Sequence, residues 1–427
     1  MKRTITAKIV RSAAAALGVA AVFLLLFAAG GCAAKPAAAP VELTIWHTYV
    51  EQMKDDFDEL VADFNETAGA KAGVTVTVTA VANSSVLNEK LLMAANGDPG
   101  APETPDMAVL YPKVAVTLEG AGKLVDLDAY FSADELAAYV PAFLAEGRFA
   151  AEGGGEDADG ADDDRRGGIL PPESGGGLYL LPIAKSTEVL YVNRTIFDRF
   201  AAETPGVTLD MLATFDGIRA AGEAYTAWTD ALTPDVPGDG KAFYYPDGLF
   251  NWFQIGAEQL GGQLIEGRKI DEDTPAFRTL SEAYLVPASR GEIAIFDDYG
   301  NYLAKTGDAV CITSTSAGAQ YYPDEVTYAD NTKEAAVFDV LPYPVFEGGE
   351  KVAMQRGGGL CLLRSDEARE RAAALFMKWL TAPEQNVRFT SRAGYMPVTQ
   401  EAFDRVMAGD DSGVDNENVR KMLRTVA

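Results

Sequence analysis

An alternation of strand-like and helix-like patterns near the start of the chain constrains its fold more than any other feature. The segments VELTIWHTY (41–49) and VTVTVTAV (74–81) are typical of short strands. Between them, residues 50–69 carry apolar side chains at the spacing of one helix face. A second helical stretch, 86–95, leads to a third strand, MAVLY (107–111), and then to another helix. This β-α-β-α-β order predicts a parallel sheet with helices on its faces.

The same α/β pattern resumes after an interruption. Residues 151–177 are rich in Gly and Asp and include the run EGGGEDADGADDDRRGG. Carboxylates at close spacing suit Ca²⁺, but their positions do not follow the calcium-loop pattern, so we favour a mobile acidic loop. The segment LYLLPIAKSTEVLYVN (178–193) predicts a strand pair, and a helix follows over 194–201. A second α/β body then extends to about residue 345.

The amino-terminal segment has the features of a secretory signal. Four basic residues within the first eleven positions precede an uncharged stretch over 13–31. Small residues stand directly before Cys32, which resembles a bacterial lipoprotein signal whose cysteine receives the lipid. We therefore predict a signal peptide over 1–31, lipidation at Cys32 and an Ala/Pro-rich tether over 32–41. A permanent transmembrane anchor is the alternative, and both arrangements place the body outside the cytoplasm.

Length, charge and cysteine content narrow the class of protein further. Without the signal, about 395 residues remain, which predicts two domains. The formal net charge of −27 argues against binding to nucleic acid or to an anionic membrane surface through bulk charge. Cys311 and Cys361 each lie within an apolar run, which favours buried free thiols over a disulfide between them.

Motifs for catalysis are incomplete. The chain has one histidine, His47, which precedes every serine candidate, and STSAG (314–318) only faintly resembles a nucleophile elbow. One histidine and scattered cysteines do not supply a zinc cluster, and no phosphate-binding or dinucleotide fingerprint is present in the sequence. We expect no cofactor and no metal. Carboxylates are abundant, so a carbohydrate-active hydrolase with paired carboxylates remains an alternative function.

Uncharged polar and aromatic residues gather instead near the ends of predicted strands. In open α/β sheets, ligands sit beyond the carboxyl ends of the strands. The positions are Trp46 to Tyr49, Tyr111, Ser314 to Ser316 and Gly357 to Gly359. Aromatic faces, hydroxyl groups and bare backbone suit a small sugar or polyol. Each position also has a structural interpretation, because the aromatic residues could be core, Ser316 a helix cap and the glycines a turn.

Five stretches of the sequence resemble the family 1 extracellular solute-binding proteins of ABC importers. They are LTIWHTY, LPIAKSTEVLYVNRTIF, GDAVCITSTSAG, RGGGLCLL and ALFMKWLTAPEQNVRFTSRAGYMPVTQEAF, in family order within residues 42–402. The resemblance implies an α/β fold of the type II periplasmic-binding-protein kind, with two hinged lobes and a ligand cleft between them. One lobe would comprise 42–182 plus 346–398, and the other 183–345 plus 399–427, without the family's final helices.

Within that family, the sequence looks most similar to binders of glycerol 3-phosphate and related sugars. The resemblance implicates Ser186, Trp252, Ser316, Tyr395 and one of the glycines 357 and 358 as ligand contacts. Where glycerol-phosphate binders carry Tyr and Tyr-Glu, this chain has Ser84 and Tyr111-Pro112, so Lys185 or Arg356 would have to supply a cation for a phosphate. The predicted ligand-binding residues are Trp46, His47, Ser84, Tyr111, Lys185, Ser186, Trp252, Ser314, Ser316, Gly357, Gly358 and Tyr395.

These patterns together predict a lipid-anchored substrate-binding component of an ABC importer at the extracytoplasmic face of the cell membrane. It would capture a small carbohydrate or glycerol-phosphate-type solute by lobe closure and deliver it to the permease subunits. We expect a monomer that catalyses no reaction and binds no nucleic acid. A receptor that feeds a sensor kinase is a further alternative to the importer.

Overall fold

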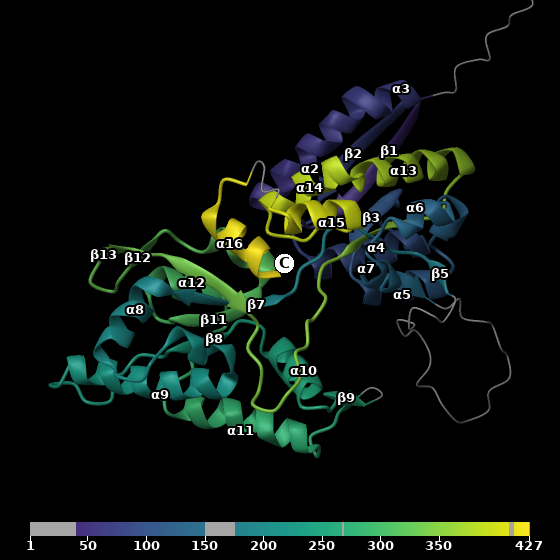
Figure 1. The fold of residues 1–427 in the computed structure, drawn as a ribbon. Helices are drawn as coiled ribbons and strands as arrows, with labels where there is room; N and C mark the ends of the chain where they lie inside the picture. Colours follow the sequence, from purple (N-terminus) through teal and green to yellow (C-terminus); the bar gives the residue numbers. More distant parts are fainter. Residues whose placement is uncertain (1–39, 150–175, 267–268, 410–413, 427) are drawn as a thin grey trace, which may run out of the picture. The chain divides into compact units, whose positions relative to one another are not determined.

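A computed structural model describes residues 40–149, 176–266, 269–409 and 414–426 of the chain (Figure 1). The predicted signal peptide, Cys32 and almost all of the predicted tether and acidic loop lie outside the described residues. Among the described helices, none is both long and apolar enough to cross a membrane.

The first sheet has five strands in the order β2-β1-β3-β15-β6. Strands β1 (Val41–His47), β2 (Val74–Ala80) and β3 (Met107–Leu110) come from the β-α-β-α-β run, and β1 and β3 are parallel, as predicted. β15 (Gly359–Leu362) lies antiparallel between β3 and β6 (Leu181–Pro182). The sheet as a whole is mixed, because a strand from far along the chain, outside the β-α-β-α-β run, enters it in the opposite direction.

The helices of the first run begin and end close to the predicted positions. α2 (Glu51–Phe64) is followed by one π-helical turn, η1 (Asn65–Gly69), and by α3 (Ala70–Ala72). Next come α4 (Ser84–Asn96) and α5 (Pro112–Gly120). The buried face of α2 includes the apolar side chains whose spacing predicted the helix, which are Met53, Phe57, Leu60, Val61 and Phe64. Further elements of the first part of the chain are η2 (Leu127–Ala129), α6 (Ala133–Ala137), α7 (Pro141–Ala145), β4 (Arg148–Phe149) and β5 (Gly177–Leu178).

The second sheet has four strands in the order β14-β7-β11-β8. β7 (Glu188–Asn193) lies antiparallel to both β14 (Phe338–Pro342) and β11 (Cys311–Thr315), and all six of its residues are buried. β11 is parallel to β8 (Tyr244–Pro246). The strand pair predicted over 178–193 is instead divided, with β6 in the first sheet and β7 in the second.

Helices and short strands surround this second sheet in the chain order. They are α8 (Arg194–Glu203), η4 (Leu209–Ala213), α9 (Phe215–Leu232), α10 (Leu249–Gln259), β9 (Ile265–Glu266), β10 (Lys269–Ile270), α11 (Pro275–Ser289), α12 (Gly300–Thr306), η5 (Ser316–Tyr321), β12 (Glu325–Thr327) and β13 (Lys333–Ala335). After β15 come α13 (Glu367–Leu380), α14 (Pro383–Arg392), α15 (Gln400–Met407) and α16 (Glu417–Val426).

The last helix, α16, packs against the second sheet. Lys421 Nζ donates to the carbonyl of Phe338 at 2.7 Å, and Thr425 Oγ1 donates to that of Val340 at 2.6 Å. Both acceptors belong to β14. The lobe boundaries inferred from the family resemblance stay a prediction.

The two cysteines of the described chain lie in different sheets. Cys311 is in β11 and Cys361 is in β15, and both are buried free thiols. Burial raises the pKa of the Cys361 thiol to about 12. This confirms the prediction of buried free cysteines and explains their place in apolar runs, since each fills a core position on a central strand.

Candidate ligand-binding site

The segment that connects β6 to β7 pairs with two later parts of the chain. Ser186 and Arg356 exchange backbone hydrogen bonds of 3.0 and 2.8 Å, and Lys185 and Met396 exchange bonds of 3.1 and 2.6 Å. These bonds hold two later parts of the chain, the return segments around Arg356 and Met396, beside the connection between the two sheets. The glycines and the tyrosine predicted to contact a ligand lie in those return segments.

Gly357 and Gly358 lie where backbone segments approach closely. Gly357 has a φ of +107°, and a Cβ atom there would lie 2.5 Å from the carbonyl oxygen of Ala184. A Cβ on Gly358 would lie 2.8 Å from the carbonyl oxygen of Leu110. Only glycine combines this backbone conformation with this proximity, so the Gly-rich run has a structural reason that is independent of any ligand.

A pocket of about 280 Å³ opens next to these glycines. Its lining residues come from α2, β3 and α4, which belong with the first sheet, from η5, which belongs with the second, and from the segments that follow β1 and β3 and precede α12. The tyrosines that line it are Tyr49, Tyr111, Tyr299, Tyr321 and Tyr395. The other lining residues are glycines, apolar residues and the uncharged polar residues Thr48, Ser84 and Asn88. No charged side chain is among the described residues that line this pocket.

Burial raises the pKa of three of the pocket tyrosines, Tyr49, Tyr321 and Tyr395, and so keeps their hydroxyl groups neutral. Burial, with the neighbouring phenols of Tyr111 and Tyr321, raises the pKa of Tyr395 above its ordinary value. Burial also raises the pKa of Tyr49, and Tyr395 and Tyr111 add to the shift. A neutral phenol both donates and accepts a hydrogen bond, and its ring offers an apolar face. The pocket therefore presents several groups that suit hydroxyl and C–H surfaces and none that suits a net charge.

The two cations considered for a phosphate are both paired elsewhere. Lys185 is 1% exposed and forms an ion pair with Glu146, whose carboxylate also accepts a hydrogen bond from Gln355 at 2.9 Å. Arg356 Nη1 lies 2.6 Å from Glu188, a carboxylate that is 6% exposed. Removing Arg356 would leave the buried carboxylate of Glu188 without its cation, which is costly, and removing Lys185 would leave the half-buried carboxylate of Glu146 with only the hydrogen bond from Gln355. Neither cation lines the pocket.

Carboxylates near Arg356 form a separate polar group in the second part of the chain. Asn251 Nδ2 donates to Glu188 at 3.1 Å, and Ser314 Oγ donates to Asp247 at 2.6 Å. Burial raises the pKa of Glu188 and of Asp247, while Arg356 opposes the shift in both. Each of these side chains forms a hydrogen bond to another side chain of the protein. Ser314 therefore has a structural role through Asp247 that needs no ligand.

The predicted site residues fall into two groups. Five of them line the pocket: Ser84, Tyr111, Gly357, Gly358 and Tyr395. The others do not: Trp46 belongs to the core of the first sheet, Lys185, Ser186 and Ser314 hold the partners described above, and Trp252 lines a different cavity. His47 is fully buried, and its Nδ1 accepts a hydrogen bond from the backbone N–H of Tyr49 at 3.1 Å.

Ser316 joins the end of β11 to the connection between the sheets. It is fully buried, its Oγ accepts from the N–H of Thr187 at 3.2 Å, and its own N–H donates to the carbonyl of Thr187 at 2.7 Å. Ser316 therefore has a structural role in joining β11 to the connection between the sheets. The ligand-contact role of all twelve predicted residues stays a prediction.

Eleven lining residues were absent from the predicted set, and the polar or aromatic ones among them are Thr48, Tyr49, Asn88, Tyr299 and Tyr321. Tyr49 follows β1 and was among the strand-end positions that the rule selected, but it was not carried into the predicted ligand contacts. Tyr299 and Tyr321 lie before α12 and at the end of η5, and no local pattern distinguishes them from other exposed or half-buried tyrosines.

Residues 59–416 match the sequence model of a family described as bacterial extracellular solute-binding protein. The chain belongs to this family. These are the solute-binding components of ABC transporters and bind their substrates rather than convert them, so the hydrolase alternative is not carried further. No curated protein matches the sequence.

Solved structures resemble this solute-binding protein across most of its length. The cyclic alpha-maltosyl-1,6-maltose binding protein of Arthrobacter globiformis has a TM-score of 0.64 at 19% identity, covering 91% of this chain and 87% of its own. UgpB from Mycobacterium tuberculosis, in complex with glycerophosphocholine, has a TM-score of 0.62 at 19% identity, with coverages of 85% and 80%. The GacH receptor of Streptomyces glaucescens has a TM-score of 0.64 at 17% identity, covering 89% of this chain and 84% of its own. At these identities the likeness shows the fold, which is the predicted two-lobed, periplasmic-binding-protein-like α/β fold.

Proposed function

We propose that this solute-binding protein captures a small, uncharged, polyhydroxylated solute, a carbohydrate or polyol, in the tyrosine-lined pocket. The observation that carries the proposal is the pocket lining, which combines five tyrosines with no charged side chain. Rings cover the C–H faces of a sugar, and neutral hydroxyls and amides read its hydroxyl groups. An anionic solute such as a glycerol phosphate would find no free cation there, because Lys185 and Arg356 are paired with carboxylates.

The structural neighbours support the same class without fixing it. One similar protein is named for binding cyclic alpha-maltosyl-1,6-maltose, and a second, the GacH receptor, is solved with acarbose. A third, UgpB, is solved with glycerophosphocholine. A pocket of about 280 Å³ is slightly smaller than the usual range for small-molecule sites, roughly 300–1,000 Å³, which favours a compact solute.

The tyrosines provide the direct test of this pocket. A thermal-shift screen of neutral sugars and polyols selects a ligand, because a compound that binds only the folded state raises the melting temperature. Tyr111→Ala and Tyr299→Ala should then each weaken binding by about tenfold in isothermal titration, since one stacked ring contributes on the order of 1 kcal/mol or more. Both side chains are exposed, at 53% and 70%, so the melting temperature without ligand should change little.

Tyr302 supplies the matched control. It is 45% exposed, lies in α12 three residues after Tyr299, and does not line the pocket. Tyr302→Ala should bind the selected ligand as the unmodified protein does. Equal affinity in all three variants would contradict the proposal.

We further propose, on the family resemblance, that Cys32 carries a lipid anchor and that the loaded protein delivers its solute to permease subunits. The support is the small-residue stretch before Cys32 and the family's place in ABC transport. Mass spectrometry of the mature amino terminus checks the anchor, and an unmodified Cys32 in the native host would refute it.

A further inference from the structure

A second cavity lies in the part of the chain that surrounds the second sheet. It has a volume of about 380 Å³ and shares no lining residue with the tyrosine pocket. Its walls come from α9, α10 and α11, from β8, and from the segments around residues 292 and 346. Nothing in the proposed function uses this cavity, although it holds Trp252, a residue that the family resemblance had implicated in ligand binding.

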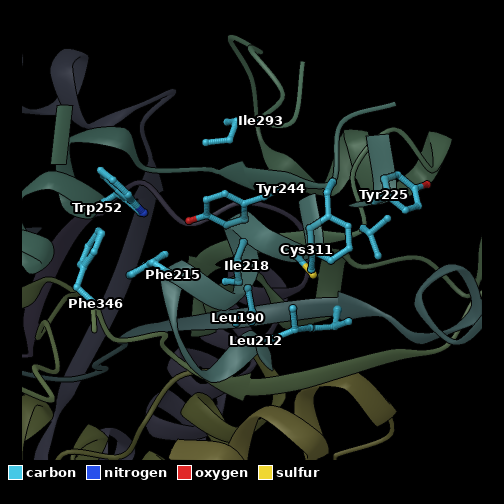
Figure 2. Packing of buried hydrophobic residues seen from close by; sticks show 14 of the residues in the cluster. Leu190, Leu212, Phe215, Ile218, Tyr225, Tyr244, Trp252, Ile293, Cys311 and Phe346 are labelled. Carbon is cyan, nitrogen blue, oxygen red and sulfur yellow. The ribbon is translucent and has the colours of Figure 1, made fainter. Parts of the chain in front are cut away.

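Aromatic side chains form one wall of the cavity. Figure 2 shows Trp252, Phe215 and Phe346 close together, with Tyr244 and Ile218 beside them. The ring centroids of Phe215 and Phe346 are 4.5 Å apart, and Trp252 meets both rings edge-on at 5.5 and 5.4 Å. Because the rings pack against one another, their positions are fixed without an occupant, which lowers the entropic cost of binding.

A buried carboxylate in the same cavity lacks a hydrogen-bonding partner. Glu292 is 5% exposed and lines the cavity. Arg290 Nη1 lies 3.8 Å from its carboxylate, beyond hydrogen-bond distance, and no hydrogen bond reaches this carboxylate from the described residues. A buried charge is unfavourable unless it is paired and hydrogen-bonded. The indole N–H of Trp252, 2% exposed, likewise has no hydrogen-bond partner among the described residues.

The charges that line the cavity favour a cationic occupant. Besides Glu292, the lining includes Asp216 and Glu347, against one basic lining residue, Arg219, and against Arg290, which lies within ion-pair distance of Glu292 but does not line the cavity. Arg219 lies 3.9 Å from Asp216, so part of its charge is already balanced. The excess of carboxylates over cations therefore attracts an ammonium group, and the aromatic wall attracts either the cation itself or its apolar body.

We propose that this cavity is a second ligand site, which takes a small organic cation with its ammonium group on Glu292 and its apolar body against Phe215, Trp252 and Phe346. The site goes beyond the proposed solute function. It also assigns Trp252 to a ligand contact that is separate from the solute pocket.

The test compares a cation with its neutral isostere on the full protein. Benzylamine, protonated at neutral pH, and benzyl alcohol have nearly the same shape, and ligand-observed NMR titration measures the affinity of each. The unmodified protein should bind benzylamine at least about tenfold more tightly than benzyl alcohol, which corresponds to the attraction of one carboxylate. Glu292→Gln should remove this preference. Equal binding of the two probes, or an unchanged preference in Glu292→Gln, would overturn the proposal.

A second variant keeps the result independent of Glu292's role in stability. Gly222 lines the cavity, and a Cβ there would lie at ordinary contact distance, 3.7 Å, from the Cβ atoms of Glu292 and Phe243. Gly222→Leu should fill the space and abolish benzylamine binding while the carboxylate remains. Benzylamine binding that survives in Gly222→Leu would also count against the cavity.

Tyr111→Ala separates this site from the solute pocket. Tyr111 lines only the solute pocket, so the variant should keep benzylamine binding and lose solute affinity. Glu292→Gln should keep the solute affinity and lose the preference for benzylamine. Loss of benzylamine binding in Tyr111→Ala would place the cation in the solute pocket and refute a second site. The proposed function is decided separately, by the isothermal titration of the tyrosine variants with the selected sugar or polyol.

Discussion

His47, the single histidine of the chain, is fully buried beside Tyr49 and Phe57. Its Nδ1 accepts the backbone N–H of Tyr49, so the neutral ring carries its proton on Nε2, which has no partner among the described residues. Burial lowers the pKa of His47 from 6.5 to about 4, with a smaller opposing effect from Asp58. Protonation would add a buried charge and break the bond from Tyr49.

This shift predicts a specific dependence of stability on pH. Between pH 6.5 and about 4 the unfolded chain binds a proton at His47 and the folded protein does not, so the free energy of unfolding falls as the pH falls through this window. The loss is about 3 kcal/mol at most, from 1.36 kcal/mol per pKa unit. Urea denaturation at pH 7, 6 and 5 measures it.

His47→Asn isolates the contribution of the histidine, because the amide oxygen can accept the same N–H from Tyr49 without titrating. The variant should lose less stability than the unmodified protein between pH 7 and 5. The raised pKa values of Glu188 and Asp247 act in the opposite direction, favouring the folded state as the pH falls, and they are common to both proteins. An identical pH dependence in the two proteins would show that His47 is not held neutral.

At the scale of elements, the entry of β15 into the first sheet depends on the glycines that precede it. Gly357→Ala should lower the free energy of unfolding by about 2–5 kcal/mol, because it combines a positive φ with a contact between Cβ and the Ala184 carbonyl. Gly348→Ala is the control, since Gly348 also has a positive φ, +75°, but nothing lies within 4 Å of its Cβ position. That variant should lose only about 1–2 kcal/mol.

Guanidinium denaturation of the two glycine variants gives the comparison. If Gly357→Ala proves no less stable than Gly348→Ala, the close approach of the return segment to the connection between the sheets is not what requires glycine there.

Elements with a strong local period were predictable from the sequence. The apolar spacing of α2 and the β-branched run of β2 were sufficient to place both, within a few residues at each end. Local patterns did not predict the direction of β15 or the division of residues 178–193 between two sheets, because strand pairing depends on partners far along the chain. Only the lobe ranges implied by the family resemblance separated residues up to 182 from those that follow. β15 pairs with β3, some 250 residues earlier, and no local pattern encodes that register.

At the scale of the whole molecule, the family resemblance predicted the fold class, and the comparison with solved structures confirms it. The candidate site was predicted only in part. Tyr111 directly follows β3, at a carboxyl end where a general rule applies, whereas Gly357 lies just before β15 and was selected for its bare backbone. Tyr299 and Tyr321 join the same pocket only because the fold brings segments some 200 residues away next to Tyr111.

The measurement that tests the central claim most directly is isothermal titration of the purified protein with neutral sugars and polyols and with glycerol 3-phosphate, followed by recovery of the ligand. A pocket lined by tyrosines and without a free cation should bind at least one neutral compound, at roughly micromolar strength or tighter, and release it unchanged. It should bind glycerol 3-phosphate more weakly than that compound. Tight binding of the phosphate alone, or chemical conversion of any bound compound, would contradict the account.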